Sequence, residues 1–160
     1  MPDLTAIILT RNEARHVAEC IASLRWADRV LVFDSHSDDG TQELARAAGA
    51  EVIERRFDNY AAQRNAALDS VAADWVFFVD ADERGTPALA AEVRRVTAER
   101  PESAWYVPRH NYIFGRLTLG AGWYPDYPLR LLRHGRARYI RPGHEIAEAA
   151  GATGYRETPP

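Results

Sequence analysis

Short apolar runs alternate with more polar, helix-like stretches along the first hundred residues of the chain. The apolar runs are rich in β-branched and aromatic residues, and they predict strands over residues 4–9, 30–33, 52–53 and 75–79. The stretches between them predict helices over residues 14–24, 41–49, 59–68 and 86–99. The predicted strands begin roughly 25 residues apart, which is the spacing of βαβ units. The pattern therefore predicts an α/β fold with a mostly parallel sheet flanked by helices.

One of these runs, Trp75–Val79, is apolar at every position. Such a strand is buried on both faces, so we place it at the centre of the predicted sheet. The pattern changes after Pro101, where shorter strands are predicted over residues 105–107, 129–132 and 137–140, between loops rich in aromatic residues, glycine and proline. We therefore expect one domain over residues 1–160, with an α/β part over residues 1–100 and a small mixed β region over residues 101–160.

The residue types present exclude several classes of phosphate-handling protein. All twenty basic residues are arginine, and the chain has no lysine. This excludes the P-loop lysine, the receiver-domain lysine and any Schiff base, because each of these needs an ammonium group. Cys20 is the only cysteine and lies in an apolar helical stripe, so we interpret it as a core thiol with no redox role.

The sequence shows no feature of a membrane-spanning or secreted chain. No stretch approaches the roughly 18 apolar residues that span a bilayer, and Met1 is followed by Asp3 where a leader would have a basic region. We expect a cytoplasmic location, which is compatible with peripheral docking on the inner face of the cell membrane.

The charges are unevenly distributed along the chain. Residues 1–104 carry 12 arginines against 19 acidic residues, whereas residues 105–141 carry 7 arginines and a single acid, Asp126. An acidic part beside a basic part favours an anionic substrate between them, and the alternative is a solvated charged face. The net charge of the whole chain is −3, so we do not expect a nucleic-acid partner.

The string Asp80-Ala81-Asp82-Glu83 directly follows the predicted central strand. Two carboxylates at positions i and i+2 of an extended chain point the same way, so Asp80 and Asp82 are expected to face one hard cation or its ligands. The alternative is that these acids cap the next helix.

Other polar residues follow the ends of neighbouring predicted strands. Thr10, Asn12 and Glu13 come after the first strand, and Asp34 closes the second. Because the carboxyl ends of parallel strands share one edge of the sheet, these groups are expected to converge with the acidic string. Arg64, on the preceding predicted helix, either reaches the same crevice or is an exposed helical arginine.

Four strings in this order resemble the motifs of family 2 glycosyltransferases: Ile8–Glu13, Val32–Ser35 with Ser37–Thr41, Gln63–Ala66 and Phe78–Glu83. Within that family the chain is most similar to the lipopolysaccharide core glucosyltransferase type. That second resemblance lies in Trp123–Asp126, Leu129–Leu132 and His144–Glu145. The resemblance covers roughly residues 4 to 146. The family usually continues with further helices beyond the point where this chain stops.

The resemblance implies the GT-A fold and inverting sugar transfer that depends on Mg²⁺ or Mn²⁺. The donor would be a nucleotide sugar, foremost a UDP-sugar, and the acceptor a glycan or lipid-linked saccharide in bacterial cell-surface polysaccharide or lipopolysaccharide biosynthesis. Residues 1–100 would form the nucleotide-sugar-binding part and residues 101–160 an incomplete acceptor-side part, with peripheral membrane contact through the missing helices.

The resemblance also implies a role for each candidate residue. Asp34 would bind the base, Asp80 would lie near the ribose and the metal, and Asp82 would bind the cation. The other nucleotide-sugar ligands would be Thr10, Asn12, Glu13 and Arg64. Glu145 or Asp126 would be the general base, because an inverting displacement needs a carboxylate to take the acceptor proton. His144 would assist as a metal ligand or as a phosphate contact.

Two alternative functions remain open. The first is a non-catalytic fragment that binds a nucleotide sugar but lacks acceptor machinery. The second is a sugar nucleotidyltransferase, which is disfavoured because that class has a glycine-rich first loop and Thr10–Glu13 contains no glycine. Measuring donor hydrolysis and transfer in one preparation separates the first alternative from a transferase.

Overall fold

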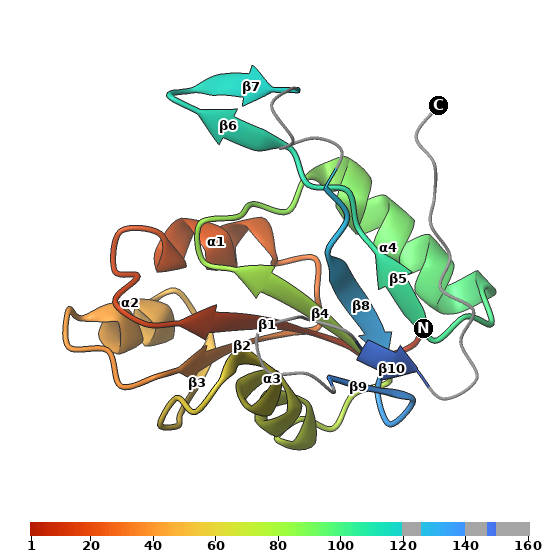
Figure 1. Ribbon diagram of the computed structural model, residues 1–160, viewed down its shortest axis with the longest axis horizontal. Coiled ribbons are helices and arrows are strands. Elements are labelled where there is room, and N and C mark those ends of the chain that lie inside the picture. Colours follow the sequence, from red (N-terminus) through yellow and green to blue (C-terminus); the bar gives the residue numbers. More distant parts are fainter. Residues whose placement is uncertain (120–125, 140–146, 150–160) are drawn as a thin grey trace.

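The computed structural model of the protein describes residues 1–119, 126–139 and 147–149. Its centre is a six-stranded sheet with the strand order β3-β2-β1-β4-β8-β5 (Figure 1). The first four strands along the chain are parallel: β1 (Leu4–Thr10), β2 (Arg29–Asp34), β3 (Glu51–Glu54) and β4 (Trp75–Asp80). The last two are β8 (Leu129–Arg133), antiparallel to β4, and β5 (Ala104–Tyr106), antiparallel to β8. The predicted α/β fold with a mostly parallel sheet is therefore confirmed.

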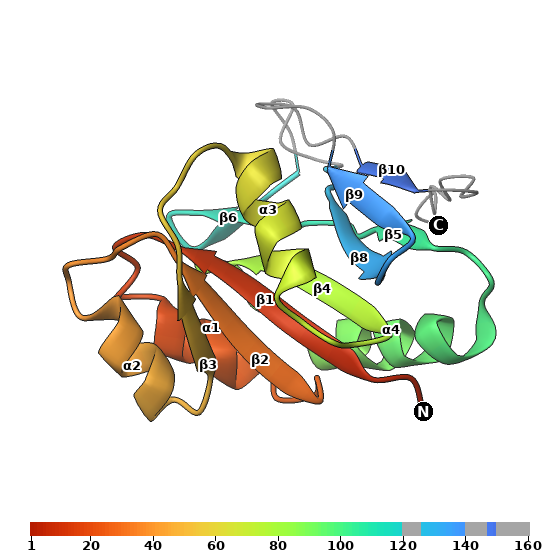
Figure 2. The same cartoon turned by 90° about the horizontal axis from the view of Figure 1, so that it is seen from below.

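Helices cover both faces of the sheet (Figure 2). The helices are α1 (Val17–Ser23), α2 (Thr41–Ala47), α3 (Tyr60–Asp69) and α4 (Pro87–Glu99). Apolar residues of α1, α2 and α4 share one core cluster, whereas those of α3 belong to a second cluster on the opposite face. Successive residues of β4 alternate between the two: Phe77 packs in the first cluster, and Val76 and Phe78 pack in the second. The apolar run of β4 is thus explained by burial on both faces.

Helices α3 and α4 begin where the sequence predicts, each after a residue whose side chain caps the helix. Asn59 caps α3 by accepting a hydrogen bond from the Ala62 N–H at 2.9 Å, and Thr86 caps α4 by accepting one from the Leu89 N–H at 3.1 Å. The first helix begins at Val17, later than predicted. Residues 14–16 form a turn that leads into the helix, and the Ala14 N–H donates to Asp39 Oδ2 in the loop before α2.

Two small sheets lie beyond residue 101, and three of their four strands were not predicted. The strands β6 (Asn111–Ile113) and β7 (Arg116–Thr118) form a hairpin of their own, which projects from the body of the protein (Figure 1). The strands β9 (Ala137–Tyr139) and β10 (Ala147–Ala149) form the second two-stranded sheet. The strand predicted over residues 137–140 is β9. The strands β6, β7 and β10 were not predicted; each has three residues, which gives a period-2 pattern few positions to show itself. Within the described ranges, no helix has the length and apolar character that crossing a bilayer requires.

Candidate active site

Asp34, the last residue of β2, is fully buried at the carboxyl-terminal edge of the sheet. Thr10 Oγ1 and Ser37 Oγ donate to its Oδ2 at 2.7 and 2.6 Å. The Ser37 N–H and Gln42 Nε2 donate to its Oδ1 at 2.8 and 2.9 Å. Burial opposes ionisation, but the hydrogen bonds from Ser37, Thr10 and Gln42 outweigh it and hold the pKa of Asp34 below its ordinary value of 3.8. As an ionised carboxylate, Asp34 therefore connects three parts of the fold: β1, the loop after β2, and α2.

The Asp34→Asn variant is expected to lose about 1–3 kcal/mol of stability at neutral pH, since an amide cannot accept four hydrogen bonds as the carboxylate does. A carboxyl group with a lowered folded pKa stabilises the fold above its unfolded pKa, and this contribution is lost as pH falls through the folded pKa. The difference from wild type should therefore shrink below about pH 4.

Urea denaturation across the acid range, with the free energy of unfolding compared at each pH, measures this difference. The matched control is Asp38→Asn, because Asp38 is an exposed neighbour in the same loop. A stability loss for Asp34→Asn that stays constant with pH would contradict the role assigned to the carboxylate.

The loops that follow β1 and β2 are tied together beside Asp34. Asn12 has a left-handed backbone, with φ of 56°, a conformation that asparagine tolerates better than most residues. Its N–H donates to Ser37 Oγ at 2.8 Å, and its side-chain oxygen accepts from the Asp38 N–H at 3.0 Å. The Glu13 N–H donates to Thr41 Oγ1 at 2.8 Å. The backbone around Asn12 and Glu13 is therefore fixed at this edge of the sheet.

Asp80 ends β4 and pairs in register with Leu9 of β1. Arg130 Nη2 of β8 donates to Asp80 Oδ2 and to Glu83 Oε1, both at 2.7 Å. The Arg130 side chain is only 5% exposed, so water screens these ion pairs weakly. Burial of Asp80 opposes ionisation, but Arg130, and the more distant Arg64, hold its pKa below the ordinary value of 3.8.

Two more arginines extend this cluster. Arg64 of α3 lies with Nη2 3.7 Å from Asp80 Oδ1, so it reaches Asp80 from the face of the sheet that α3 covers. Arg109 donates to Glu83 Oε1 at 3.3 Å and to Asp126 Oδ2. The Arg109 N–H also donates to the Asp126 carbonyl oxygen at 2.9 Å, in an antiparallel bridge. We call the set Asp80, Arg130, Glu83, Arg109 and Asp126 the carboxylate–arginine network.

A cavity of about 670 Å³ lies between the end of β4, the start of α4 and the segment from β5 to β6. Its described lining includes Asp82, Glu83, Arg109, Arg130 and Tyr112. Thr10 and Asp34 are not part of this lining, although they lie at the same edge of the sheet. The volume suits a small molecule, and charges of both signs suit a polar ligand.

Asp82 lies in the turn after β4, is exposed, and lines this cavity. Among the hydrogen bonds and ion pairs between described residues, none involves its side chain. The described ranges contain no group of three or more His, Cys, Asp or Glu side chains that could hold a metal ion. Such a group is not needed for Mg²⁺, which one or two carboxylates hold together with substrate phosphates. The chemistry of Asp82, an exposed carboxylate, is therefore compatible with a hard cation.

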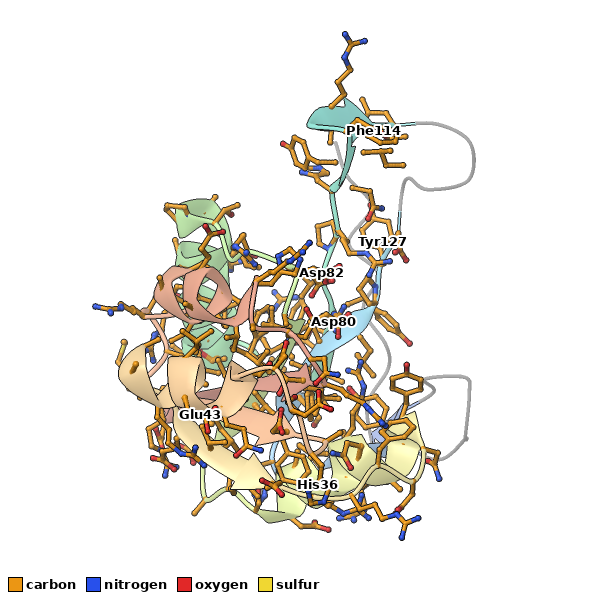
Figure 3. The ribbon with its side chains drawn as sticks, turned by 90° about the vertical axis from the view of Figure 1, so that its left-hand side faces the viewer. His36, Glu43, Asp80, Asp82, Phe114 and Tyr127 are labelled. Atoms are coloured by element: carbon orange, nitrogen blue, oxygen red, sulfur yellow. The ribbon has the colours of Figure 1, made fainter. Side chains whose placement is uncertain are left out.

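The prediction that Asp80 and Asp82 share an extended chain is wrong. β4 ends at Asp80, and the Glu83 N–H donates to the Asp80 carbonyl oxygen at 2.9 Å, which closes a turn. Within this turn Ala81 is buried and Asp82 is exposed. The two carboxylates lie near each other at the strand end (Figure 3), but only Asp80 is held by arginines.

The structure thus groups the predicted residues in two places. Thr10 and Asp34 are hydrogen-bonded to each other, whereas Asp80, Arg64 and Asp126 belong to or adjoin the carboxylate–arginine network. Two predicted residues, the metal ligand His144 and the candidate base Glu145, lie outside the described residues.

Sequence reasoning did not single out Glu83, Arg109 and Arg130 as site residues. A signal for Arg130 was present, because it is the only charged residue in the apolar run Leu129–Leu132. A charge in a buried strand requires a partner, and the acids that follow β4 were available. Arg109 has no comparable signal beyond the basic character of residues 105–141.

Residues 5–153 match the sequence profile of Glycosyl transferase family 2. The chain is 33% identical over 147 residues to the lipopolysaccharide core biosynthesis glycosyltransferase LpsC of Rhizobium meliloti (strain 1021), covering 85% of this chain and 53% of that protein. It is 33% identical over 106 residues to an uncharacterized glycosyltransferase of Rickettsia felis, covering 66% of this chain and 38% of that protein. The chain spans about half or less of the length of these relatives.

Solved structures show the same fold. Mannosyl-3-phosphoglycerate synthase from Rubrobacter xylanophilus is similar with a TM-score of 0.57 and 28% identity, over 64% of this chain and 38% of that chain. Mannosyltransferase PcManGT from Pyrobaculum calidifontis, in complex with GDP-Man and Mn²⁺, is similar with a TM-score of 0.57 and 26% identity, over 68% and 38%. These neighbours are GT-A glycosyltransferases, so the predicted GT-A fold is confirmed.

Proposed function

The chain belongs to glycosyl transferase family 2, and we propose that it moves a sugar from a nucleotide-sugar donor to a glycan or lipid-linked acceptor. The observation that carries this proposal is the setting of Asp82, an exposed carboxylate that shares a cavity with Arg109 and Arg130. A carboxylate suits a divalent cation, and guanidinium groups suit phosphate oxygens. This combination is what a donor with a diphosphate group requires.

The proposed donor side is the carboxyl-terminal edge of β1, β2 and β4. We assign nucleotide-sugar binding to Thr10, Asn12, Glu13, Asp34, Arg64 and Asp80, with a UDP-sugar as the first candidate. The assignment of Asp34 to the base carries a structural requirement. Asp34 already accepts four hydrogen bonds, so a uracil N–H that bonds to it must replace one of them. The complex of PcManGT with GDP-Man and Mn²⁺ supports a nucleotide sugar and a divalent metal in general.

The proposed cation is Mg²⁺ or Mn²⁺ at Asp82, with His144 as a further candidate ligand. When bound, the cation supplies Lewis-acid stabilisation of the departing nucleoside diphosphate. The protein's own contribution is electrostatic: Arg130 and Arg109 fix Glu83 beside Asp82, and Arg130 also holds Asp80. These ion pairs hold the string Asp80–Glu83 in place and leave the carboxylate of Asp82 available for the cation.

We propose an inverting displacement in which a carboxylate takes the proton of the acceptor hydroxyl. The candidates are Glu145 and Asp126, in that order. Asp126 lies at the far end of the network from Asp80, and Arg109 already binds one of its oxygens. A base in this position must give up that ion pair or act through its other oxygen.

The biological setting that we propose is the synthesis of a bacterial surface glycan. The support is the name of the Rhizobium relative, a lipopolysaccharide core biosynthesis glycosyltransferase. This chain covers 53% of that protein, so the acceptor is proposed only as a class.

A thermal-shift screen tests the proposed function. UDP-, GDP-, ADP- and dTDP-sugars are each added with Mn²⁺, and in parallel with a chelator. A donor at about 100 times its dissociation constant should stabilise the fold by about 2.7 kcal/mol, because it binds only the folded state. We expect this with one class of donor and only with the metal; no shift with any donor would contradict nucleotide-sugar binding.

A further inference from the structure

The hairpin formed by β6 and β7 carries apolar side chains that the described chain leaves exposed. The exposed fractions are 101% for Phe114, 66% for Tyr112, 58% for Leu119, 43% for Leu117 and 40% for Ile113. Tyr112 and Leu117 are paired across the strands and share one face, while Ile113 is paired with Arg116 on the other. A two-stranded hairpin with no face in a core is at best marginally stable in water, so this composition favours an environment other than water.

The turn of the hairpin gives no local reason for an aromatic residue. Phe114 and Gly115 have φ of 50° and 72°, and they are the two residues between β6 and β7. Such two-residue turns favour asparagine, aspartate or glycine at the first position, because a bulky residue with positive φ is strained. The phenyl ring of Phe114 lies at the far tip of the hairpin, away from the body of the protein (Figure 3). The aromatic residue is therefore explained by a contact that the tip of the hairpin makes outside the described chain.

The charge of this segment indicates which kind of surface the tip of the hairpin binds. No aspartate or glutamate occurs between Glu102 and Asp126, whereas Arg109 and Arg116 do. Arg116 directly follows the Phe114–Gly115 turn and is exposed. Aromatic and aliphatic side chains flanked by arginine, without acids, are typical of segments that bind the interface of an anionic bilayer. A second copy of the hairpin would bring like charges together.

We propose that the β6–β7 hairpin docks on an anionic membrane surface, with Phe114 and its apolar neighbours inserted and Arg116 at the level of the lipid phosphates. Tyr112 of the hairpin also lines the cavity that contains Asp82. A bilayer at the hairpin therefore lies close to the cavity, where it would present a lipid-linked acceptor. That last step rests on the proposed function, whereas the docking itself does not.

Sedimentation with vesicles tests the docking. The protein is mixed with vesicles of phosphatidylcholine containing about one third phosphatidylglycerol, and with vesicles of phosphatidylcholine alone. We expect preferential binding to the anionic vesicles, weakened at least about 10-fold by Phe114→Ser and about 5-fold by Arg116→Gln. The matched control is Leu44→Ser, because Leu44 is a 41% exposed apolar residue on α2, and its binding should equal that of wild type.

Three outcomes overturn the proposal: no binding of wild type to anionic vesicles, equal binding of wild type and Phe114→Ser, or a dimer by light scattering that Phe114→Ser dissociates. UDP affinity, measured separately in solution with Mn²⁺, should be unchanged in Phe114→Ser. A wild-type protein that binds vesicles but no nucleoside diphosphate would contradict the proposed function and leave the docking intact.

Discussion

Replacing Asp82 with asparagine should abolish the part of nucleoside diphosphate affinity that depends on a divalent cation. Asp82 is the carboxylate that lines the cavity and has no hydrogen bond or ion pair with other described residues. An amide is a poor ligand for a hard cation, so the stabilisation of several kcal/mol that the metal gives a developing diphosphate is lost. Sugar transfer should fall on the order of 1,000-fold.

Calorimetric titration with UDP, with Mn²⁺ and with a chelator, measures the binding part of this prediction. The affinity of Asp82→Asn with Mn²⁺ should fall to that of chelated wild type, at an unchanged melting temperature. Glu43→Gln is the matched control, since it removes one negative charge from an exposed position on α2. Metal-dependent affinity that survives in Asp82→Asn would place the cation elsewhere.

Replacing Arg130 with glutamine should destabilise the fold by about 3 kcal/mol. Removing one member of a buried ion pair costs about 3–5 kcal/mol. Here the Arg130 side chain is 5% exposed, but those of Asp80 and Glu83 are 39% and 21% exposed, so water compensates part of the loss. Two carboxylates, Asp80 and Glu83, lose their shared guanidinium. Arg64 and Arg109 remain near them, so we expect the lower end of that range.

Thermal and urea denaturation measure the effect, and a loss of this size lowers the melting temperature of a 160-residue protein by about 10 °C. The matched control is Arg138→Gln. Arg138 also forms an ion pair, with Asp69 at 2.8 Å, but its side chain is 57% exposed. An exposed pair contributes at most about 1 kcal/mol, so the control should be close to wild type. Equal losses in the two variants would contradict the buried role of Arg130.

The Arg130→Gln variant also tests the candidate active site. If Arg130 fixes the acidic string, Arg130→Gln should also weaken metal-dependent UDP binding at a temperature where the variant is fully folded. Asp82 is unchanged in this variant, so a loss of affinity would come from the turn that carries it or from the missing Arg130 guanidinium, which lines the same cavity. Retained affinity would show that the turn after β4 is held by its own hydrogen bond between Asp80 and Glu83.

The order of the elements from β1 to α4 and their helical or extended character were determined by local sequence. Period-2 and period-3.6 patterns, and caps such as Asn59 and Thr86, act over a few residues, so they are readable without the fold. The general edge at which Thr10, Asp34 and Asp80 lie followed from the parallel strands. Even the basic character of residues 105–141 was visible in the sequence.

Only the tertiary structure decided which charges meet. Arg130 pairs with Asp80, fifty residues earlier, because β8 enters the sheet antiparallel beside β4, and neither that neighbour nor that direction is encoded in a local pattern. The same holds for Arg109 and Glu83. Both arginines donate to Glu83, in the turn that separates Asp80 from Asp82. The exposure of Phe114 could not be predicted from the sequence either. An apolar residue in a sequence suggests burial, and only the fold shows that nothing in the described chain covers this side chain.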